Sequence, residues 1–535
     1  MSAYKLLILV FSATCLSFEA SDPTVTTPLG KIRGHYKTSF KHKKFSAFDG
    51  IPYGKPPIGT KRFEAPQPID KWDGTWDATH LQECAQIHTI YGKSTMSGNE
   101  DCLYVNVYVP RILINVTDNL DVIVHIHGGG FSTLSGHNYA HPGYLMDHDV
   151  IFVTFNYRIG ILGFLSTEDD AIPGNNGFKD QVLALKWVQE NIYSFGGNPG
   201  SVTLTGASAG GASVHLHYLS PMSVGLFHRG FSQSGSALNS WVVQAEASNK
   251  AKTVALAVGC PEAPTHKLKE CLKQRPYQQI LSKMSLFCGY KNHAPVPFNL
   301  VLEKGSNSFL SEHPYGLLVT GQVQDLPWLV SFVEHEGYFI VDGFRDRIET
   351  MNQKWEQVAP FMIYYNYTVA KNHWGDVARQ IKDFYLGKNE KFAGSNFDNL
   401  VRLAGEGVMI HGVVKSVLVQ AAVTNASVYL FHLSYTGDKN IISHGDDNQY
   451  FYYGENEKAL TKNQLKMKDI FIDMLVTYAK TGTPSINGTV WEPAKDDHLN
   501  FLKISSPEKR HIHMETNNDL GNQNFWDSLE SSEKN

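Results

Sequence analysis

The chain has no hydrophobic run of about 20 residues, which is the length that a bilayer-spanning helix requires. It also has little excess charge, since its formal net charge is −5 over 535 residues, and this balance gives no indication of nucleic acid as a partner. Between residues 22 and 535 there is no linker rich in Gly, Ser or Pro, no block of like charges and no internal repeat. Although the length alone predicts about three domains, these absences favour one large domain over residues 21–535.

The first 20 residues have the pattern of a secretory signal. A weakly basic start precedes an apolar stretch from Leu6 to Leu16 that is too short to span a bilayer, and small residues near Cys15 and Ser17 permit cleavage. The last four residues, 532–535, form neither a lipid-anchor signal nor an ER-retention signal. We therefore expect a signal peptide over residues 1–20, a secreted (extracellular) protein and no membrane anchor.

A serine hydrolase motif lies near the middle of the chain. Residues 202–205 form a short β-like run, residues 206–210 fit G-x-S-x-G with Ser208 as the serine, and a small-residue stretch compatible with a helix follows. This order is typical of a nucleophile elbow, a tight strand-to-helix turn that glycines make possible. We expect the Ser208 hydroxyl at a helix N-terminus, where backbone N–H groups and the helix dipole favour a developing negative charge.

A serine hydroxyl is a weak nucleophile unless a base takes its proton, and in this chain order the acid and the histidine follow the serine. His444 lies in a polar loop after the β-like run 427–435, where a catalytic loop is expected. The acid is expected directly after the apolar run 327–333, where both Glu334 and Glu336 stand. The glycine after Glu336 favours that residue only mildly, so the motif alone leaves both open.

A third motif supplies candidate donors for an oxyanion hole. The strand-like run 121–127 ends in His127 and three glycines, which is the HGGG pattern of lipases and esterases. The backbone N–H groups of Gly129, Gly130 and Ala209 are expected to donate to the oxygen of the tetrahedral intermediate. Loss of one such donor typically costs about 3–4 kcal/mol of transition-state stabilisation.

Two longer stretches carry a resemblance to a known family. Residues 195–210 and 100–110 resemble the two signatures of the type-B carboxylesterases, the cholinesterase and insect esterase branch of the α/β-hydrolase fold. The resemblance spans nearly the whole mature chain and implies a large, mostly parallel sheet flanked by helices. It identifies Glu336 as the acid and supports His444.

The same resemblance implies supporting residues around the site. It implies a hydroxyl at Ser234 beside the triad, a buried ion pair between Arg158 and Glu100, and scaffold segments such as 174–177. It also implies two disulfides, Cys84–Cys102 and Cys260–Cys271, each closing a short loop worth on the order of 3 kcal/mol. Cys288 is then left over, and a buried free thiol is favoured there over an intermolecular link. Four sequons fit a glycoprotein and begin at Asn115, Asn366, Asn425 and Asn487.

The expected strands and helices alternate along the chain, and the site is expected at the carboxyl ends of the strands. The strands are expected at residues 121–127, 150–157, 201–205, 229–233, 327–333 and 427–435, and the helices include 180–193 and 465–480.

One departure from the family pattern concerns the substrate. Relatives that act on choline esters usually carry Glu immediately before the serine and Trp in the first disulfide loop, which together hold a quaternary ammonium. This chain has Ala207, and no Trp lies between Cys84 and Cys102. A cholinesterase is therefore not expected. Juvenile hormone esterases also resemble the chain but commonly have Gln before the serine, so Ala207 weakens that assignment without excluding it.

The sequence thus predicts a secreted serine carboxylesterase that acts on a small-molecule ester and needs no metal or cofactor. Ser208 attacks the ester carbonyl, His444 acts first as base and then as acid, Glu336 orients His444, and water hydrolyses the acyl-enzyme. One alternative is a slow scavenger of esters or organophosphates. Another is a non-catalytic adhesion homologue, which the retained triad disfavours. The natural ester and the oligomeric state are not determined by the sequence.

Overall fold

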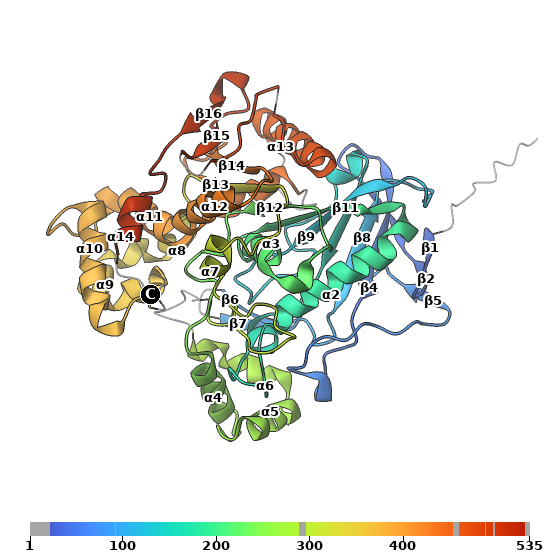
Figure 1. Ribbon diagram of the computed structural model, residues 1–535, viewed down its shortest axis with the longest axis horizontal. Coiled ribbons are helices and arrows are strands. Elements are labelled where there is room, and N and C mark those ends of the chain that lie inside the picture. Colours follow the sequence, from blue (N-terminus) through green and yellow to red (C-terminus); the bar gives the residue numbers. More distant parts are fainter. Residues whose placement is uncertain are drawn as a thin grey trace, which may run out of the picture.

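The computed structural model describes residues 22–90, 93–287, 296–366, 368–452, 460–486, 488–495 and 498–529. The proposed signal peptide, Cys288 and Asn487 lie outside these residues. An 11-stranded sheet with the order β16-β15-β14-β13-β12-β11-β9-β10-β8-β4-β3 forms its centre (Figure 1). Neighbouring strands pair in parallel throughout the central part of the sheet, which runs in space from β15 to β10. Beyond β15 and beyond β10 the pairing is antiparallel.

Six of the seven parallel strands correspond to the runs expected from the sequence, and the seventh, β15, was not among them. The seven strands are β9 (Leu120–Ile126), β10 (Val150–Phe155), β11 (Gly197–Ala207), β12 (Arg229–Gln233), β13 (Trp328–Val333), β14 (Val428–Leu433) and β15 (Asn500–Ile504). At the edges lie β3 (His35–Thr38), β4 (Lys44–Pro52), β8 (Tyr104–Val109) and β16 (Ile512–Thr516). Every residue of β10, β13 and β14 is buried. Such strands are covered on both faces, which explains their nearly continuous apolar sequences.

Two hydrophobic clusters lie on opposite faces of the sheet. Val122 and Val124 of β9 belong to one cluster and Ile123 to the other, as the two-residue period of a strand requires. Helices cover both faces. The first cluster includes residues of α2 (Asn176–Asn191), α3 (Ala209–Leu219) and α12 (His411–Val423), whereas α13 (Lys462–Thr481) contributes to the second. A large, mostly parallel sheet flanked by helices is therefore confirmed.

The start and end of α13 follow local sequence signals. Thr461 and Gln464 form a capping box in which the Gln464 side chain accepts from the Thr461 N–H at 2.8 Å. The helix ends at Gly482, whose φ of 74° is the left-handed conformation that favours glycine.

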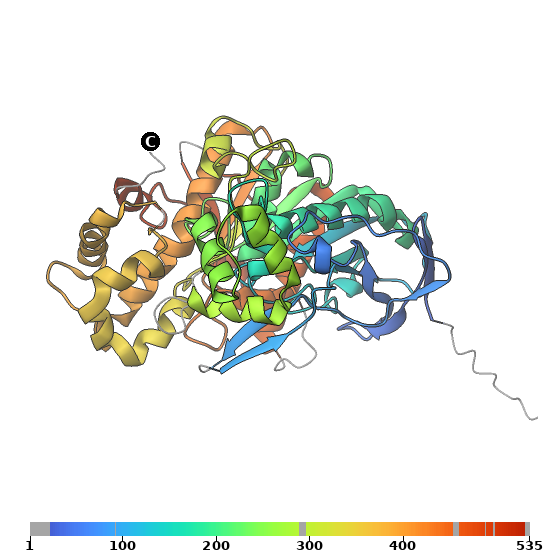
Figure 2. The ribbon, with the colours of Figure 1, turned by 90° about the horizontal axis from the view of Figure 1, so that it is seen from below.

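A second group of helices follows β13. It comprises α8 (Tyr338–Val341), α9 (Ile348–Met362), α10 (Trp374–Leu386) and α11 (Phe397–Gly405). In Figures 1 and 2, α9, α10 and α11 lie together at one end of the molecule. Among the described residues, one helical run, Gly394–Val423, has the length and composition to cross a bilayer, but 61% of its most apolar window is buried inside the fold. This is the environment of a core helix.

The resemblance-based expectation of an ion pair between Arg158 and Glu100 is wrong. The Arg158 guanidinium binds Asp180 of α2 instead, with Nη2 2.7 Å from Oδ1, and Glu100 accepts from Nη2 of Arg62 at 2.6 Å. All four side chains are buried. Asp180 also accepts from the backbone N–H of Arg158 at 3.0 Å, so helix α2 holds both the backbone and the side chain of this residue. The choice of partner depends on how α2 packs.

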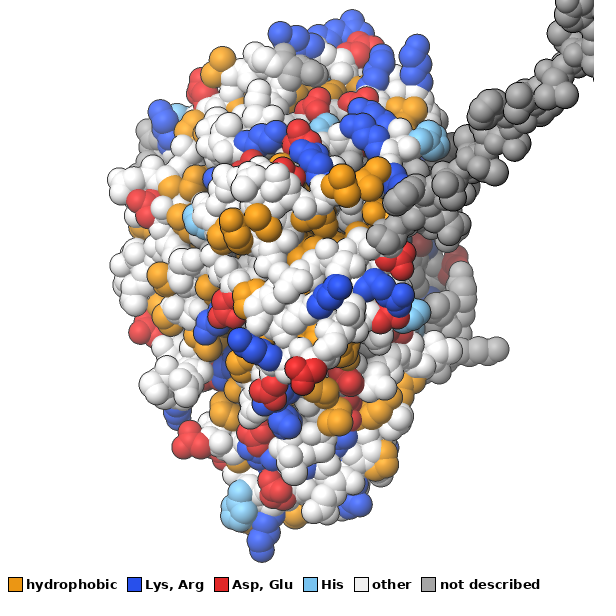
Figure 3. All heavy atoms as spheres, turned by 90° about the vertical axis from the view of Figure 1, so that its right-hand side faces the viewer, with side chains coloured by type: hydrophobic (Ala, Val, Ile, Leu, Met, Phe, Trp, Pro, Cys, Tyr) orange, Lys and Arg blue, Asp and Glu red, His pale blue; other side chains and the backbone are white. Residues whose placement is uncertain are grey.

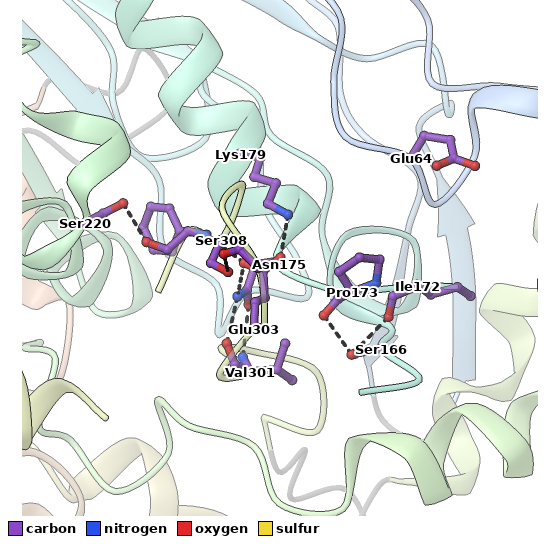
Figure 4. Close-up of polar contacts among 12 residues, drawn as sticks. Glu64, Ser166, Ile172, Pro173, Asn175, Lys179, Ser220, Val301, Glu303 and Ser308 are labelled. Atoms are coloured by element: carbon purple, nitrogen blue, oxygen red, sulfur yellow. Dashed lines mark hydrogen bonds and ion pairs between the residues drawn. The ribbon is translucent and has the colours of Figure 1, made fainter. Parts of the chain in front are cut away.

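The segment 174–177 does join separate parts of the chain, as Figure 4 shows. The Asn175 amide donates to Val301 O at 2.7 Å and to Glu303 Oε2 at 2.8 Å, and Lys179 of α2 forms an ion pair with Glu303. Lys179 and Glu303 are 7% and 4% exposed, so this pair is desolvated. The cluster fixes the segment around residue 301 against the start of α2.

Surface charge is mixed rather than segregated on the face drawn in Figure 3. Basic and acidic side chains intermingle there with apolar and uncharged ones. This distribution agrees with the small formal net charge of −5.

Candidate active site

Ser208 lies in the turn between β11 and α3. Its φ of 58° and ψ of −123° are a backbone conformation that residues other than glycine rarely adopt. The turn is held by the Ser208 N–H, which donates to Gln233 O at 2.7 Å. A Cβ added to Gly210 would lie 2.0 Å from Ile126 O, so only glycine permits α3 to approach β9 this closely.

His444 and Glu336 are brought together by two adjoining loops. Glu336 follows β13 and His444 follows β14, the next strand in the sheet. The loops pair directly, since the His335 N–H donates to Ile442 O at 3.1 Å. His444 Nδ1 lies 2.6 Å from Glu336 Oε2.

Further hydrogen bonds hold the Glu336 carboxylate, which is fully buried. Its Oε1 accepts from the Val333 N–H at 2.9 Å and from the Ser234 hydroxyl. Ser234 thus contacts the acid. Glu334, the alternative acid, points elsewhere: its Oε2 lies 3.0 Å from His432 Nε2, and its side chain is 44% exposed.

The glycine loop lies against the candidate nucleophile. A Cβ placed on Gly128 would be 3.3 Å from Cβ of Ser208. Gly129 has a φ of 91°, and its carbonyl accepts from the Thr133 hydroxyl at 3.1 Å, which closes the loop. Ala209 is buried as the first residue of α3.

Buried aromatic contacts fix the strand that leads into this loop. The Tyr157 hydroxyl donates to His127 O at 2.9 Å, and the two rings stack with their centroids 4.3 Å apart. Burial lowers the pKa of His127 to about 3, so its imidazole is neutral at physiological pH. His127 therefore serves the loop as a neutral hydrogen-bonding group.

A single cavity of about 860 Å³ brings these groups together. Ser208, His444, Gly129 and Gly130 all line it, while Glu336 lies buried behind His444. Much of the remaining wall is apolar and includes Trp241, Phe339, Phe361, Met362, Val408 and Met409. Among the described lining residues there is no Lys or Arg.

Asp447 is a buried carboxyl that the sequence motif did not single out. Burial raises its pKa to about 6, and its Oδ2 accepts from the Gln233 amide at 2.8 Å. Its Oδ1 has no hydrogen-bond partner within the described part of the chain. Asp447 follows His444 closely in sequence, but only the fold shows that it is buried.

The sequence also did not predict the walls of the cavity, because they come from segments without a motif. Apart from Trp241, the wall residues named above stand on α8, α9 and the π-helical turn Glu406–Ile410, which are far apart in the sequence. Apolar residues in amphipathic helices carry no signal that separates a cavity wall from a packed core.

Covalent and modification sites can be placed in part. The disulfides Cys84–Cys102 and Cys260–Cys271 are both present, with Cα–Cα distances of 4.9 and 5.7 Å. Of the sequon residues, Asn115 and Asn425 are exposed and Asn366 is partly exposed. No cluster of three or more His, Cys, Asp or Glu that could hold a metal ion occurs within the described ranges.

Comparison with known proteins identifies the family. Residues 21–526 match the model of the carboxylesterase family. Venom carboxylesterase-6 of Apis mellifera is 36% identical over 533 residues, covering 96% of this chain and 95% of that protein. Esterase E4 of Myzus persicae is 35% identical over 534 residues, covering 94% of this chain and 95% of that protein.

A solved structure supports the same assignment. The crystal structure of juvenile hormone esterase from Manduca sexta, with OTFP covalently attached, superimposes with a TM-score of 0.84 at 26% identity and covers 95% of this chain and 99% of that one. These matches confirm the resemblance and the expected fold. The chain belongs to the carboxylesterase family, has the α/β-hydrolase fold and is a carboxylic ester hydrolase.

Proposed function

We propose that this hydrolase works through an acyl-enzyme on Ser208, with His444 as general base and acid and Glu336 as the orienting carboxylate. The observation that carries the proposal is the 2.6 Å contact between His444 Nδ1 and Glu336 Oε2 beside a cavity that Ser208 also lines. This contact holds the proton on Nδ1. The unprotonated Nε2 is then free to accept the serine proton.

The surroundings of Glu336 suit this role. The buried Glu336 carboxyl accepts hydrogen bonds from the Val333 N–H and the Ser234 hydroxyl, and these fix its orientation towards His444. The Glu336 carboxylate stabilises the imidazolium that forms when His444 takes the serine proton. His444 then returns the proton to the leaving alcohol, and the same base activates the water that hydrolyses the acyl-enzyme.

Gly129, Gly130 and Ala209 are proposed as the donors to the oxyanion. Two observations support this assignment. The glycine loop lies directly against Ser208, and Ala209 is the first residue of α3. Backbone N–H groups at these points are fixed before the reaction begins, so they stabilise the developing charge without reorganising.

The cavity favours a neutral, largely apolar ester. Its volume of about 860 Å³ exceeds what a short ester fills, and no Lys or Arg among its described lining residues is available to bind an anionic group. Ala207 stands where a choline esterase would carry a carboxylate. We therefore propose uncharged aryl or aliphatic esters as substrates, in preference to choline esters.

Juvenile hormone ester hydrolysis is a second candidate, because a solved juvenile hormone esterase shares the fold over nearly the whole chain. A panel of short and long aliphatic, aryl and terpenoid esters separates the two. A terpenoid ester that exceeds the aryl and aliphatic esters in kcat/KM supports the second candidate. A burst followed by a very slow steady state on every ester indicates a scavenger instead.

Secretion and glycosylation belong to the same proposal. Two disulfides are typical of proteins that fold in an oxidising compartment, and Asn115 and Asn425 are exposed enough to carry glycans. The expected mature protein is extracellular and loses mass on treatment with an N-glycosidase.

Covalent labelling tests the nucleophile without knowledge of the natural substrate. An organophosphate should inactivate the enzyme stoichiometrically and with time dependence, because the tetrahedral adduct on Ser208 resists attack by water. Peptide mass spectrometry should find the adduct in residues 206–210. An adduct mainly on another residue, or inactivation without any adduct, contradicts the assignment.

A further inference from the structure

The ring of Phe339 lies flat against the imidazole of His444. Their centroids are 4.5 Å apart and their planes differ by 24°. Phe339 stands on the four-residue helix α8, which begins two residues after Glu336. Its side chain lines the cavity yet remains 48% exposed, so burial in the core does not account for its position.

The loop that carries His444 is held through its backbone. Ser443 is bridged to His335, and the Ser443 N–H donates to Asp446 Oδ2 at 2.8 Å. These contacts fix the backbone beside His444 but do not touch the imidazole. The hydrogen bond from Nδ1 to Glu336 fixes one point of the imidazole but permits the ring to tilt about that bond. A second planar group against its face opposes this tilt.

We propose that Phe339 is a positioning residue for His444. Its ring holds the imidazole in the plane where Nδ1 meets Glu336 and Nε2 is presented to Ser208. The face of an aromatic ring also attracts a cation, so the stack favours the imidazolium that forms as the serine is deprotonated. This inference rests on the proposed triad, since it assigns Phe339 a role only through His444.

Phe361 provides a matched control. It lines the same cavity and is 46% exposed, but its ring packs edge-on against Trp374, with the centroids 5.5 Å apart, whereas Phe339 is the ring that stacks on His444. Removal of either ring enlarges the cavity in a similar way. Only removal of the Phe339 ring should release the imidazole.

The experiment compares Phe339→Leu, Phe339→Tyr and Phe361→Leu with the native enzyme on 4-nitrophenyl acetate, a neutral ester too small to fill the cavity. Loss of positioning and of the stack should lower kcat of Phe339→Leu about tenfold, equal to 1.4 kcal/mol, with KM changed less than about twofold. Phe339→Tyr keeps the aromatic face and should retain kcat within about twofold. Phe361→Leu, which also removes an aromatic ring from the cavity wall, should change KM more than kcat. The rate of organophosphate labelling should follow kcat in all three.

Several outcomes overturn the inference. Equal kcat losses in Phe339→Leu and Phe361→Leu, a change in KM alone, or a Phe339→Tyr variant as slow as Phe339→Leu would make Phe339 an ordinary wall residue. Circular dichroism and thermal unfolding verify the fold, and Phe339→Met replaces the leucine variant if that one unfolds.

Failure of the proposed triad is a separate result. It shows as labelling away from Ser208 or as full activity in Glu336→Gln, whatever the Phe339 variants do.

Discussion

Glu334 and Glu336 stand two positions apart, yet they contact different histidines: Glu334 Oε2 lies 3.0 Å from His432 Nε2, and Glu336 Oε2 lies 2.6 Å from His444 Nδ1. Both carboxylates follow the same strand. Glu336 is fully buried, whereas the side chain of Glu334 is 44% exposed. The pair therefore allows the proposed orienting carboxylate, Glu336, to be compared directly with a partly exposed one, Glu334.

Glu336→Gln should lower kcat by roughly 10³-fold or more, because an amide neither stabilises the imidazolium nor enforces the tautomer with the proton on Nδ1. Glu334→Gln should keep kcat within about twofold, since Glu334 pairs with His432 and does not line the cavity. Steady-state kinetics on a neutral ester, with thermal unfolding as a check on folding, measure both. Equal losses in the two variants would contradict the assigned acid.

Ser208→Ala should abolish ester hydrolysis and organophosphate labelling but leave folding intact, because it removes a single hydroxyl from the turn. Ser234→Ala is the matched control. It removes the hydroxyl that donates to Glu336 and should lower kcat only about tenfold, as expected for one lost hydrogen bond to a charged group. Burst-phase acylation retained in Ser208→Ala would show that another residue is the nucleophile.

Substrate charge gives a third prediction. A neutral carbon isostere of acetylcholine should have a higher kcat/KM than acetylcholine itself, because Ala207 offers no charge to the ammonium group. Ala207→Glu should slightly reduce the difference in kcat/KM between the two substrates. A native preference for the choline ester would refute the proposed neutral substrate class.

Buried histidines make stability dependent on pH. Burial lowers the pKa of His217 to about 3, while an unfolded histidine titrates near 6.5. Below pH 6.5 the unfolded chain therefore binds a proton that the native state does not, and the stability present above pH 6.5 is lost as the pH falls. The loss from this one residue should be about 2 kcal/mol between pH 6.5 and 5.

Urea unfolding measured from pH 7.5 to 5 tests this dependence. His217→Gln should flatten the curve of unfolding free energy against pH. His513→Gln should leave its slope unchanged, because the His513 side chain is 51% exposed. If both variants keep the native slope, His217 is not buried as a neutral group.

The buried ion pair between Lys179 and Glu303 gives the last prediction. Glu303→Gln leaves the Lys179 ammonium buried without a countercharge and should lower the free energy of unfolding by about 3 kcal/mol. Glu356→Gln removes one of the two carboxylate partners of the half-exposed Arg379, the other being Asp376, and should change the free energy of unfolding little. Urea unfolding at pH 7.5 measures both. A Glu303→Gln variant as stable as Glu356→Gln would show that the pair is not desolvated.

Much of the fold and the candidate site followed from local patterns. Apolar runs marked six of the seven parallel strands, because strands covered on both faces need apolar side chains throughout. The G-x-S-x-G motif placed Ser208 at the strand-to-helix turn, and the structure has this turn between β11 and α3. These features are local, so a stretch of a few residues contains the information that specifies them.

Features that depend on distant partners needed the tertiary structure. The residues alone left Glu334 and Glu336 open, and packing placed only Glu336 beside His444. The expected Arg158–Glu100 pair was replaced by Arg158–Asp180, because α2 brings Asp180 to the arginine.

The sequence by itself determined six of the parallel strands, the strand-to-helix turn and the chemical groups of the candidate site. The tertiary structure decided which charges pair and which aromatic side chain stacks on His444. It also decided which apolar side chains enclose the cavity. Backbone turns and apolar periodicity are set by neighbours in the chain, whereas ion pairs, stacking and cavities depend on contacts between segments that only packing brings together.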